Sequence, residues 1–276
     1  MWIAKTKSEL RVRIDAALRP VILVPSMGAL HEGHASLILR ARQHAGADGM
    51  VIVSIFVNPI QFDSVGDFTA YPRSVEADLS VCEDHGADGV FIPDNSEMYL
   101  ADRSVTVSEN SLTKHLCGAT RSGHFDGVCT VVLKLFLLTG CDAAVFGEKD
   151  FQQLAVIRRM ARDLDLRTSI IPHPTMREDD GLAMSSRNAR LNTEQRADAP
   201  CIHRALQVAA GECDAASMLR TACEMLGHSP YARIDYVSLV DAETLSPTQS
   251  LARPAVLACA VFYGDVRLID HIMVGG

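Results

Sequence analysis

The sequence lacks the patterns of several protein classes. Its eight cysteines include no Cys-x-x-Cys pair and no cysteine-histidine spacing typical of zinc sites. No apolar run approaches the length of a membrane span, and the first ten residues have charges but no apolar core of a signal peptide. We therefore expect a cytoplasmic protein with no membrane partner, whose cysteines are reduced and mostly buried.

Basic charge is also scarce. A net charge of -8 and a pI near 5.7 offer no basic surface for a phosphate backbone, so we expect no nucleic-acid partner. Internal repeats and low-complexity tracts are absent too, which excludes a solenoid. What remains is a chain of 276 residues, 48% hydrophobic and 22% charged, long enough for two globular cores.

Two apolar runs near the amino terminus are typical of buried strands: Val21 to Val24 and Met50 to Val57. Residues 33–45 between them carry apolar side chains at helical spacing, so the order is strand, loop, helix, strand. The second run ends at Asn58-Pro59 and gives way to a polar loop up to Pro72. Ser74 is then placed to cap a further helix.

A Gly-x-Asp tripeptide recurs at Gly46, Gly86 and Gly140, each time between a helical stretch and an apolar run. Glycine can end a helix in the left-handed conformation, and aspartate can then turn the chain into a strand. Three such helix-to-strand junctions predict a doubly wound, Rossmann-like α/β domain with a parallel sheet over residues 1–175.

The sequence changes in character beyond Ile170. Prolines in Ile171-Pro-His-Pro174 are expected to break the chain, and a loop then leads to a long helix-compatible stretch rich in Ala, Glu and Arg. Alternation over residues 234–240 and an apolar run over 255–263 indicate strands. We predict a smaller α+β domain over residues 176–276 that closes over the active site.

The first chemically informative motif is Pro25-Ser-Met-Gly-Ala-Leu-His-Glu-Gly-His34, between the first expected strand and helix. Gly28 and Gly33 let the backbone approach a ligand, a helix amino terminus favours anions, and two imidazoles can donate hydrogen bonds to phosphate. An isolated His-x-x-His is more often structural, and the metalloprotease pattern His-Glu-x-x-His is absent. The motif predicts a triphosphate site and not a metal site.

A second motif, Phe146-Gly-Glu-Lys-Asp-Phe-Gln-Gln153, again follows an apolar run and opens a helix. Lys149 at a strand's carboxyl end could neutralise charge on an α-phosphate, with Asp150 holding an ATP hydroxyl or orienting the lysine. Alone, the pair would be an ordinary solvated surface pair. Its place in the expected crevice favours a function.

A third motif runs from Arg177 to Asn188. Its hydroxyls, backbone amides and guanidinium groups suit a mobile phosphate clamp. Elsewhere, the neutral amides of Asn58 and Gln61 lie among apolar neighbours, where they could recognise hydroxyls and carboxylates. Taken singly, Gln61 and Gln153 would be surface or helix-capping glutamines.

In this order the segments closely resemble the pantothenate synthetase family (pantoate-β-alanine ligases) of the HIGH-type nucleotidyltransferase superfamily, related to class I aminoacyl-tRNA synthetases. The resemblance implies an ATP-dependent ligase, with pantoate and β-alanine as substrates, that works as a homodimer. Pantoate would attack the α-phosphorus of ATP, and pyrophosphate would leave with Mg²⁺. The β-alanine amine would then attack pantoyl-adenylate to give pantothenate and AMP. The resemblance covers residues 25–34, 53–62, 71–73, 123–125, 146–154 and 180–188.

The resemblance also assigns roles. His34 is the family's proton donor and His31 its phosphate-binding companion, although departure of pyrophosphate needs charge stabilisation more than a proton, so we expect His34 to act chiefly as a hydrogen-bond donor. Gln61 and Gln153 would hold pantoate. The magnesium ligands stay unassigned: Asp78 is a conceivable metal contact, but we expect it to be an ordinary helix-surface carboxylate. The ATP contacts would be Met27, Gly28, Ala29, Leu30, His31, Glu32, Gly33, His34, Gly147, Glu148, Lys149, Asp150, Met176, Met184, Ser185, Ser186 and Arg187.

The chain departs from the family's pattern at Ser26, usually threonine, at Ser122, usually proline, and at Met176, commonly valine. None of these changes removes a group that the chemistry needs. Two rival functions remain: nucleotidyl transfer, which needs a basic acceptor pocket, and an adenine-nucleotide sensor without turnover. An aminoacyl-tRNA synthetase conflicts with the acidic charge and with the lack of an anticodon-binding extension.

Overall fold

The computed structural model describes residues 1–276 and divides them into two compact units. The first unit comprises residues 1–109, 122–148 and 156–174. The second comprises residues 110–121, 149–155 and 175–276. Each unit has its own hydrophobic core.

The first unit is built on a six-stranded, all-parallel sheet with the order β1-β4-β3-β2-β5-β6. From β2 the chain order runs outward through β3 and β4 on one side and through β5 and β6 on the other. This reversal is the topological switch point of a doubly wound fold, which confirms the expected fold class. The strands are β1 (Trp2–Ala4), β2 (Val21–Ser26), β3 (Met50–Ile55), β4 (Gly89–Phe91), β5 (Ala143–Gly147) and β6 (Ser169–His173).

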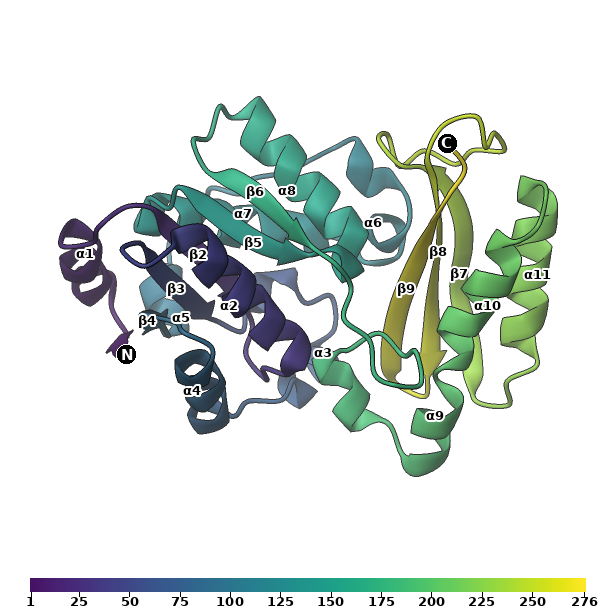
Figure 1. Cartoon of the computed structure of the whole chain (residues 1–276), viewed down its shortest axis with the longest axis horizontal. Coiled ribbons are helices and arrows are strands. Elements are labelled where there is room, and N and C mark those ends of the chain that lie inside the picture. Colours follow the sequence, from purple (N-terminus) through teal and green to yellow (C-terminus); the bar gives the residue numbers. More distant parts are fainter. The chain divides into compact units, whose positions relative to one another are not determined.

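Helices cover both faces of this sheet (Figure 1). On one face, Ile38 and Ala41 of α2 are fully buried against Val24 and Val53. On the other, the ring of Phe136 in α7 lies 6.3 Å from that of Phe146 in β5. The helical segments are α1 (Lys7–Asp15), α2 (Glu32–Ala45), η1 (Pro59–Gln61), α3 (Val65–Ala70), α4 (Val75–Asp84), α5 (Asn95–Met98), α7 (His124–Thr139) and α8 (Phe151–Asp163), of which residues 156–163 belong to this unit.

The three Gly-x-Asp junctions are confirmed, and two of the aspartates do more than turn the chain. Gly46, Gly86 and Gly140 all have positive φ. Asp88 accepts a hydrogen bond from the backbone N–H of Val51 on β3 at 2.7 Å, and Asp142 accepts one from Val21 on β2 at 2.7 Å. These two carboxylates therefore fix the start of a neighbouring parallel strand.

Two local expectations held only in part, and a third was wrong. Pro172 lies within β6, which tolerates a residue without an N–H because it is an edge strand, and the strand ends at His173, directly before Pro174. Ser74 stands at the N-cap position of α4, as expected, but makes no side-chain capping hydrogen bond. The polar segment after Asn58 is not an open loop, since it folds into η1 and α3.

The second unit has an antiparallel sheet in the order β7-β8-β9, from β7 (Ala232–Asp241), β8 (Ala255–Tyr263) and β9 (Val266–Val274). The expected single long helical stretch is broken at Pro200. Helices α10 and α11 contact the sheet, and Leu206, Leu226 and Leu257 are fully buried between them (Figure 1). The helical segments are η2 (Leu112–Lys114), α6 (Cys117–Thr120), the start of α8, η4 (Ser186–Arg190), α9 (Thr193–Asp198), α10 (Cys201–Ala210) and α11 (Ala215–Gly227).

All eight cysteines are free thiols, five of them buried.

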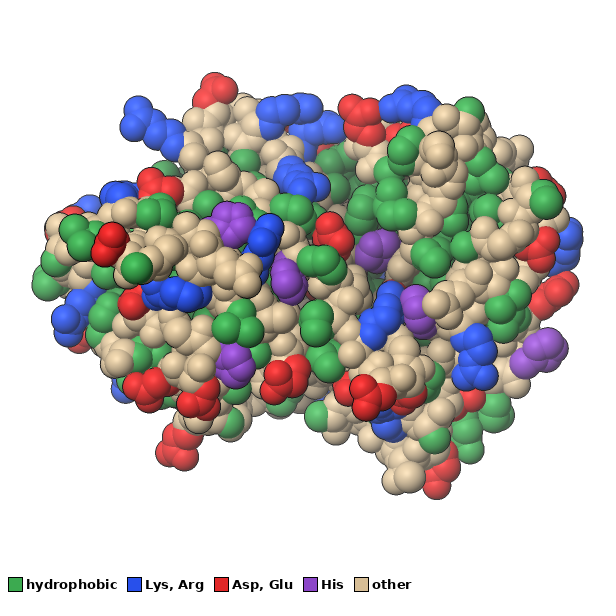
Figure 2. Space-filling model, viewed as in Figure 1, with side chains coloured by type: hydrophobic (Ala, Val, Ile, Leu, Met, Phe, Trp, Pro, Cys, Tyr) green, Lys and Arg blue, Asp and Glu red, His purple; other side chains and the backbone are tan.

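No helix is long and apolar enough to cross a membrane. On the face shown in Figure 2, acidic and basic side chains are interspersed over each unit, without a continuous basic patch.

Candidate active site

The loop between β2 and α2 has the build of a phosphate-binding loop. Gly28 and Ala29 adopt positive φ values of 86° and 51°, so the chain reverses tightly after Ser26. The hydroxyl of Ser26 accepts the N–H of Gly28 at 3.0 Å. Glu32 then starts α2, whose first N–H groups and dipole favour an anion.

His31 and His34 cap this helix, a role that the sequence reasoning missed. Nδ1 of His31 accepts the backbone N–H of Gly33 at 3.1 Å, and Nδ1 of His34 accepts that of His31 at 3.4 Å. A ring nitrogen that accepts a hydrogen bond carries no proton, so each neutral imidazole carries its proton on Nε2. The ring centres are 4.1 Å apart, and the pair therefore presents two Nε2–H donors from one short segment.

Asp78 is not the helix-surface carboxylate that was expected. Its residue is 2% exposed, and its two oxygens accept the backbone N–H groups of Ala29 at 3.0 Å and Leu30 at 2.7 Å. Burial raises the pKa of this carboxyl, against the lowering effect of the two hydrogen bonds. A Cβ on Gly28 would lie 2.9 Å from Asp78 Oδ2, so glycine is required both by φ and by this contact. The signal in the sequence was helical spacing, since Asp78 lies four residues before the buried Cys82.

Gln61 is only 7% exposed and is held from several sides. Its Oε1 accepts a hydrogen bond from Asn58 Nδ2 at 2.8 Å, and its Nε2 lies 2.9 Å from Met27 Sδ in the phosphate-binding loop. His124 Nδ1 lies 2.7 Å from the carbonyl oxygen of Gln61 and donates to it. The first unit thus brings Gln61 and Met27 into contact, and a surface glutamine is excluded.

Gly127 allows α7 to approach this segment and was also missed. A Cβ at this position would lie 2.5–2.7 Å from backbone atoms of Ile60 and Gln61. Only glycine therefore fits here, but in the sequence it looks like an ordinary helical residue.

In the second unit, Lys149 and Asp150 form a loose ion pair with a separation of 3.9 Å, and their side chains are 20% and 47% exposed. Gln153 is half-buried in the first turns of α8. Its neighbour Gln152 is buried and donates to the carbonyl oxygens of Leu112 and His115 at 2.8 and 2.7 Å. Gln152 therefore has a structural role that the sequence reasoning did not assign. Gly147 ends β5 in the first unit, and Glu148 begins the short helix η3 (Glu148–Asp150).

The third motif forms a small β-hairpin, the clamp hairpin, comprising residues 176–184. Arg177 pairs with Ala183, Met184 N–H donates to the Met176 carbonyl at 2.9 Å, and Gly181 turns the chain with a φ of 92°. Ser185 follows directly, and its hydroxyl caps η4 by accepting the N–H of Arg187 at 3.3 Å. Met176, Met184, Ser185, Ser186 and Arg187 are therefore adjoining parts of one ordered segment.

A buried ion pair anchors the clamp hairpin to β9. Arg177 donates to both oxygens of Asp270 at 2.7 and 2.9 Å and to the Gly181 carbonyl at 3.1 Å. Burial alone would raise the pKa of Asp270, but hydrogen bonds from neighbouring groups and the charge of Arg177 lower it to about 2. His203 Nδ1 is 3.4 Å from Asp270 but has no well-aligned hydrogen bond, so we attribute the lowering mainly to Arg177. The sequence reasoning did not identify Asp270.

Magnesium has no dedicated site among these residues. No group of three or more His, Cys, Asp or Glu side chains is placed to hold a metal ion. Asp78 does not fit a ligand role, because it is only 2% exposed and already accepts a backbone N–H on each oxygen. Mg²⁺ often binds proteins through few carboxylates and mainly through substrate phosphates and water.

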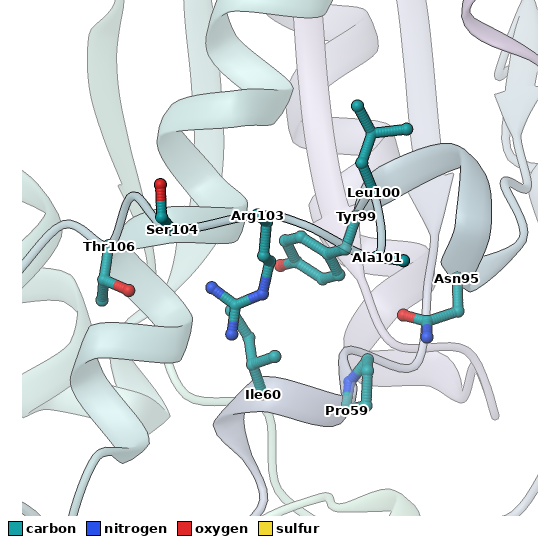
Figure 3. Close-up of a pocket in the computed structure, with 9 residues that line it drawn as sticks. All are labelled: Pro59, Ile60, Asn95, Tyr99, Leu100, Ala101, Arg103, Ser104 and Thr106. Atoms are coloured by element: carbon teal, nitrogen blue, oxygen red, sulfur yellow. The ribbon is translucent and has the colours of Figure 1, made fainter.

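The first unit has a surface pocket of about 480 Å³ (Figure 3). None of the residues assigned to ATP or pantoate lines it. Its wall includes Pro59 and Ile60, which precede Gln61, and the ring of Tyr99.

The doubly wound sheet and the build of its β2–α2 loop are typical of α/β proteins that bind nucleotides. The family of the chain follows from comparison with known proteins: the pantoate-beta-alanine ligase family model matches residues 2–273. The chain belongs to the pantoate-β-alanine ligase family and is an enzyme, a ligase.

Relatives resemble the chain over nearly its whole length. Pantothenate synthetase from Akkermansia muciniphila is 50% identical over 279 residues, and that from Fervidobacterium nodosum 47% over 282 residues, each covering 99% of both chains. The crystal structure of pantothenate synthetase from Thermus thermophilus has a TM-score of 0.91 and 41% identity, with full coverage of both chains. Pantoate-beta-alanine ligase from Francisella tularensis, complexed with beta-gamma ATP and beta-alanine, has a TM-score of 0.82 and 30% identity, and covers 99% of this chain and 97% of its own.

Proposed function

We propose that the chain condenses pantoate with β-alanine at the expense of ATP, through an enzyme-bound pantoyl-adenylate. The observation that carries this proposal is the family match over residues 2–273, on a chain whose β2–α2 loop has the build of a phosphate site. The pantoate carboxylate attacks the α-phosphorus and displaces pyrophosphate. The β-alanine amine then attacks the acyl carbon, loses a proton, and displaces AMP to leave pantothenate.

Residues 27–34 bind the phosphates of ATP in this proposal. Gly28, Gly33 and the start of α2 offer backbone N–H groups, and His31 and His34 offer Nε2–H donors, because their Nδ1 atoms accept backbone N–H groups. A donor held by capping bonds is already oriented when negative charge develops. His34 therefore acts chiefly as a hydrogen-bond donor to phosphate and not as an acid.

In the second unit, Lys149 neutralises negative charge at the α-phosphate, and Asp150 orients the lysine or holds a hydroxyl of ATP. The loose 3.9 Å pairing leaves the ammonium group able to bind another anion. Met176 and residues 184–187 bind ATP, as do Gly147 at the end of β5 and Glu148 directly after it. The hydroxyl and N–H groups around η4 supply hydrogen bonds for phosphate oxygens.

Pantoate is bound by Gln61 and Gln153, with Gln61 also near β-alanine. Neutral amides can hold hydroxyl and carboxylate groups without forming an ion pair with the carboxylate that must attack. Gln153→Ala is accordingly expected to raise KM for pantoate more than KM for ATP.

No side chain of the chain is assigned to Mg²⁺, which would be held mainly by the triphosphate and water and would supply charge that offsets that of the leaving pyrophosphate. We further propose, on the family resemblance alone, that the enzyme is a cytoplasmic homodimer, which sedimentation equilibrium would test through a mass of twice 30.0 kDa.

Pantoate-dependent exchange of labelled pyrophosphate into ATP, with Mg²⁺ present and β-alanine withheld, isolates the first half-reaction. We expect exchange only when pantoate is added, and pantothenate only when β-alanine follows. If folded protein binds ATP but shows no exchange, the adenylate route is wrong. A sensor or nucleotidyl transferase would then account better for the ATP binding.

A further inference from the structure

Tyr99, Asn58 and Gln61 form a continuous chain of hydrogen bonds inside the first unit. The Tyr99 hydroxyl donates to Asn58 Oδ1 at 2.9 Å, and Asn58 Nδ2 donates to Gln61 Oε1 at 2.8 Å. Asn58 Nδ2 also donates to the Gly127 carbonyl at 3.1 Å. Asn58 is 1% exposed, so water does not compete for these groups.

The direction of this chain is fixed by Gly127. A carbonyl oxygen can only accept, so the group of Asn58 that faces Gly127 must be its NH₂. Its oxygen then faces Tyr99, which can donate, and its second N–H reaches Gln61. Gln61 must therefore turn its oxygen toward Asn58 and its NH₂ away from it.

Tyr99 is suited to supply the first donor. Burial raises its pKa to about 12, despite the nearby Arg103, so the hydroxyl keeps its proton at physiological pH. The outer side of its ring lines the surface pocket, and the guanidinium of Arg103 lies over it, 5.3 Å from its centre (Figure 3). The ring therefore lies between the pocket and the interior, where its hydroxyl reaches Asn58.

We propose that Tyr99 is a positioning residue for substrate recognition: its hydroxyl holds Asn58, whose direction the Gly127 carbonyl sets, in the place from which Asn58 Nδ2 makes Gln61 present its NH₂, and not its oxygen, to pantoate. This inference rests on the proposed role of Gln61 in binding pantoate. An NH₂ group recognises an acceptor, such as a carboxylate oxygen or a hydroxyl lone pair. A Gln61 amide free to rotate would spend part of its time with its oxygen toward the substrate, where two acceptors repel.

Tyr99→Phe removes only the hydroxyl and leaves Asn58 Oδ1 without its donor. We expect KM for pantoate to rise about tenfold, as the loss of one buried hydrogen bond allows, with KM for ATP changed less than about twofold. Steady-state kinetics of pantothenate formation measure both values, and thermal denaturation checks the fold. Tyr263→Phe is the matched control, because Tyr263 is a fully buried tyrosine of the second unit that donates to Asp198 at 2.9 Å and has no role in the proposed site. It should leave KM for pantoate unchanged.

A double-mutant cycle tests whether Tyr99 acts through Gln61. In a Gln61→Ala background, Tyr99→Phe should change KM for pantoate by less than about twofold, since no amide remains to be oriented. An equal rise in both backgrounds, an equal rise in the two KM values, or no rise at all would overturn the inference.

If Tyr99→Phe does not fold, Asn58→Leu decides, because leucine keeps the branched shape but has neither donor nor acceptor. It should raise KM for pantoate in the same selective way, and an unchanged KM would overturn the inference. Failure of the proposed function would give a different result: the wild-type protein would make no pantothenate. That result would overturn both the proposed function and the inference on Tyr99.

Discussion

In each unit, a buried aspartate holds one of the proposed ATP-binding segments in place. The two aspartates differ in their partners, because one has a cation beside it and the other does not. Asp78 holds the phosphate-binding loop through two backbone N–H groups and has no cation beside it. Asp270 holds the clamp hairpin through the guanidinium of Arg177. The pKa of Asp78 is raised by burial, while that of Asp270 falls to about 2 because Arg177 and its neighbours outweigh burial.

The difference follows from what each aspartate must fix. Asp78 fixes backbone amides next to the proposed phosphate site, where a cation paired with Asp78 would be shared with the phosphates of ATP. Asp270 fixes a side chain that bridges to the turn of a hairpin, which requires a long cationic donor such as Arg177. A backbone anchor can be neutral or charged, whereas a side-chain ion pair stabilises only while both partners are charged.

The largest expected effect is on the Asp270 anchor. Asp270→Asn leaves Arg177 next to a neutral amide in a buried site, and we expect the free energy of unfolding to fall by about 3 kcal/mol. Urea denaturation measures the loss, and amide hydrogen exchange should show it first in residues 177–184. Glu243→Gln is the control, because its partner Arg253 is 64% exposed and the pair is at the surface. A loss for Asp270→Asn no larger than for this control would refute the anchor.

Lys149→Ala tests a residue of the second unit that is expected to contribute to the reaction and not to the stability of the fold. We expect pantoate-dependent pyrophosphate exchange to drop about 100-fold or more, because a preorganised charge at the α-phosphate is lost, with unfolding unchanged. Lys114→Ala, which removes an exposed lysine of the same unit, should keep the wild-type rate. Normal turnover by Lys149→Ala would show that the lysine does not neutralise developing charge.

Most of the fold could be predicted because its signals are local. Apolar runs marked β2, β3 and β8, helical spacing marked α2, and glycine at the junctions marked the ends of helices. Strand β9 was missed because Asp270 interrupts its alternation. Its partner Arg177 lies 93 residues away, so nothing near Asp270 shows that its charge is compensated.

The candidate site was predicted as a set of segments and not as a set of contacts. The motifs identified His31, His34 and the clamp hairpin, but not that the two imidazoles cap α2. Asp78 was misplaced for the same reason as Asp270, since the amides that it binds lie 48 and 49 residues away. Interactions set by tertiary packing have no local pattern from which they can be inferred.

The pH dependence of the protein's stability tests directly whether Asp270 is held in its ionised form. The pKa of Asp270 is about 2 in the folded protein and near 3.8 in the unfolded chain, so the folded state binds fewer protons between these values. The carboxylate therefore contributes its full stabilisation only at a pH above about 3.8. As pH falls from about 4 to about 2, roughly 2 kcal/mol should be lost. Comparing urea denaturation of the wild type with that of Asp270→Asn from pH 2 to 6 isolates this contribution: their difference should grow as pH rises. A difference that does not change with pH would mean that the carboxyl is not held ionised.

The smallest expected effect on stability concerns Asp78, and its pH dependence should be opposite to that of Asp270. Asp78→Asn keeps one acceptor but turns an NH₂ group toward a backbone N–H, so we expect a loss of about 1 kcal/mol in unfolding free energy and weaker ATP binding. Because the folded pKa of Asp78 is raised, the folded state binds more protons than the unfolded state, and the advantage of aspartate over asparagine is greatest at low pH. The stability difference between wild type and Asp78→Asn should therefore shrink as pH rises, opposite to that for Asp270→Asn. Urea denaturation of both variants and the wild type over the same pH range gives each stability difference as a function of pH. If both differences changed with pH in the same direction, the two carboxylates would lie in the same kind of electrostatic environment, and the comparison drawn from their different partners would be wrong.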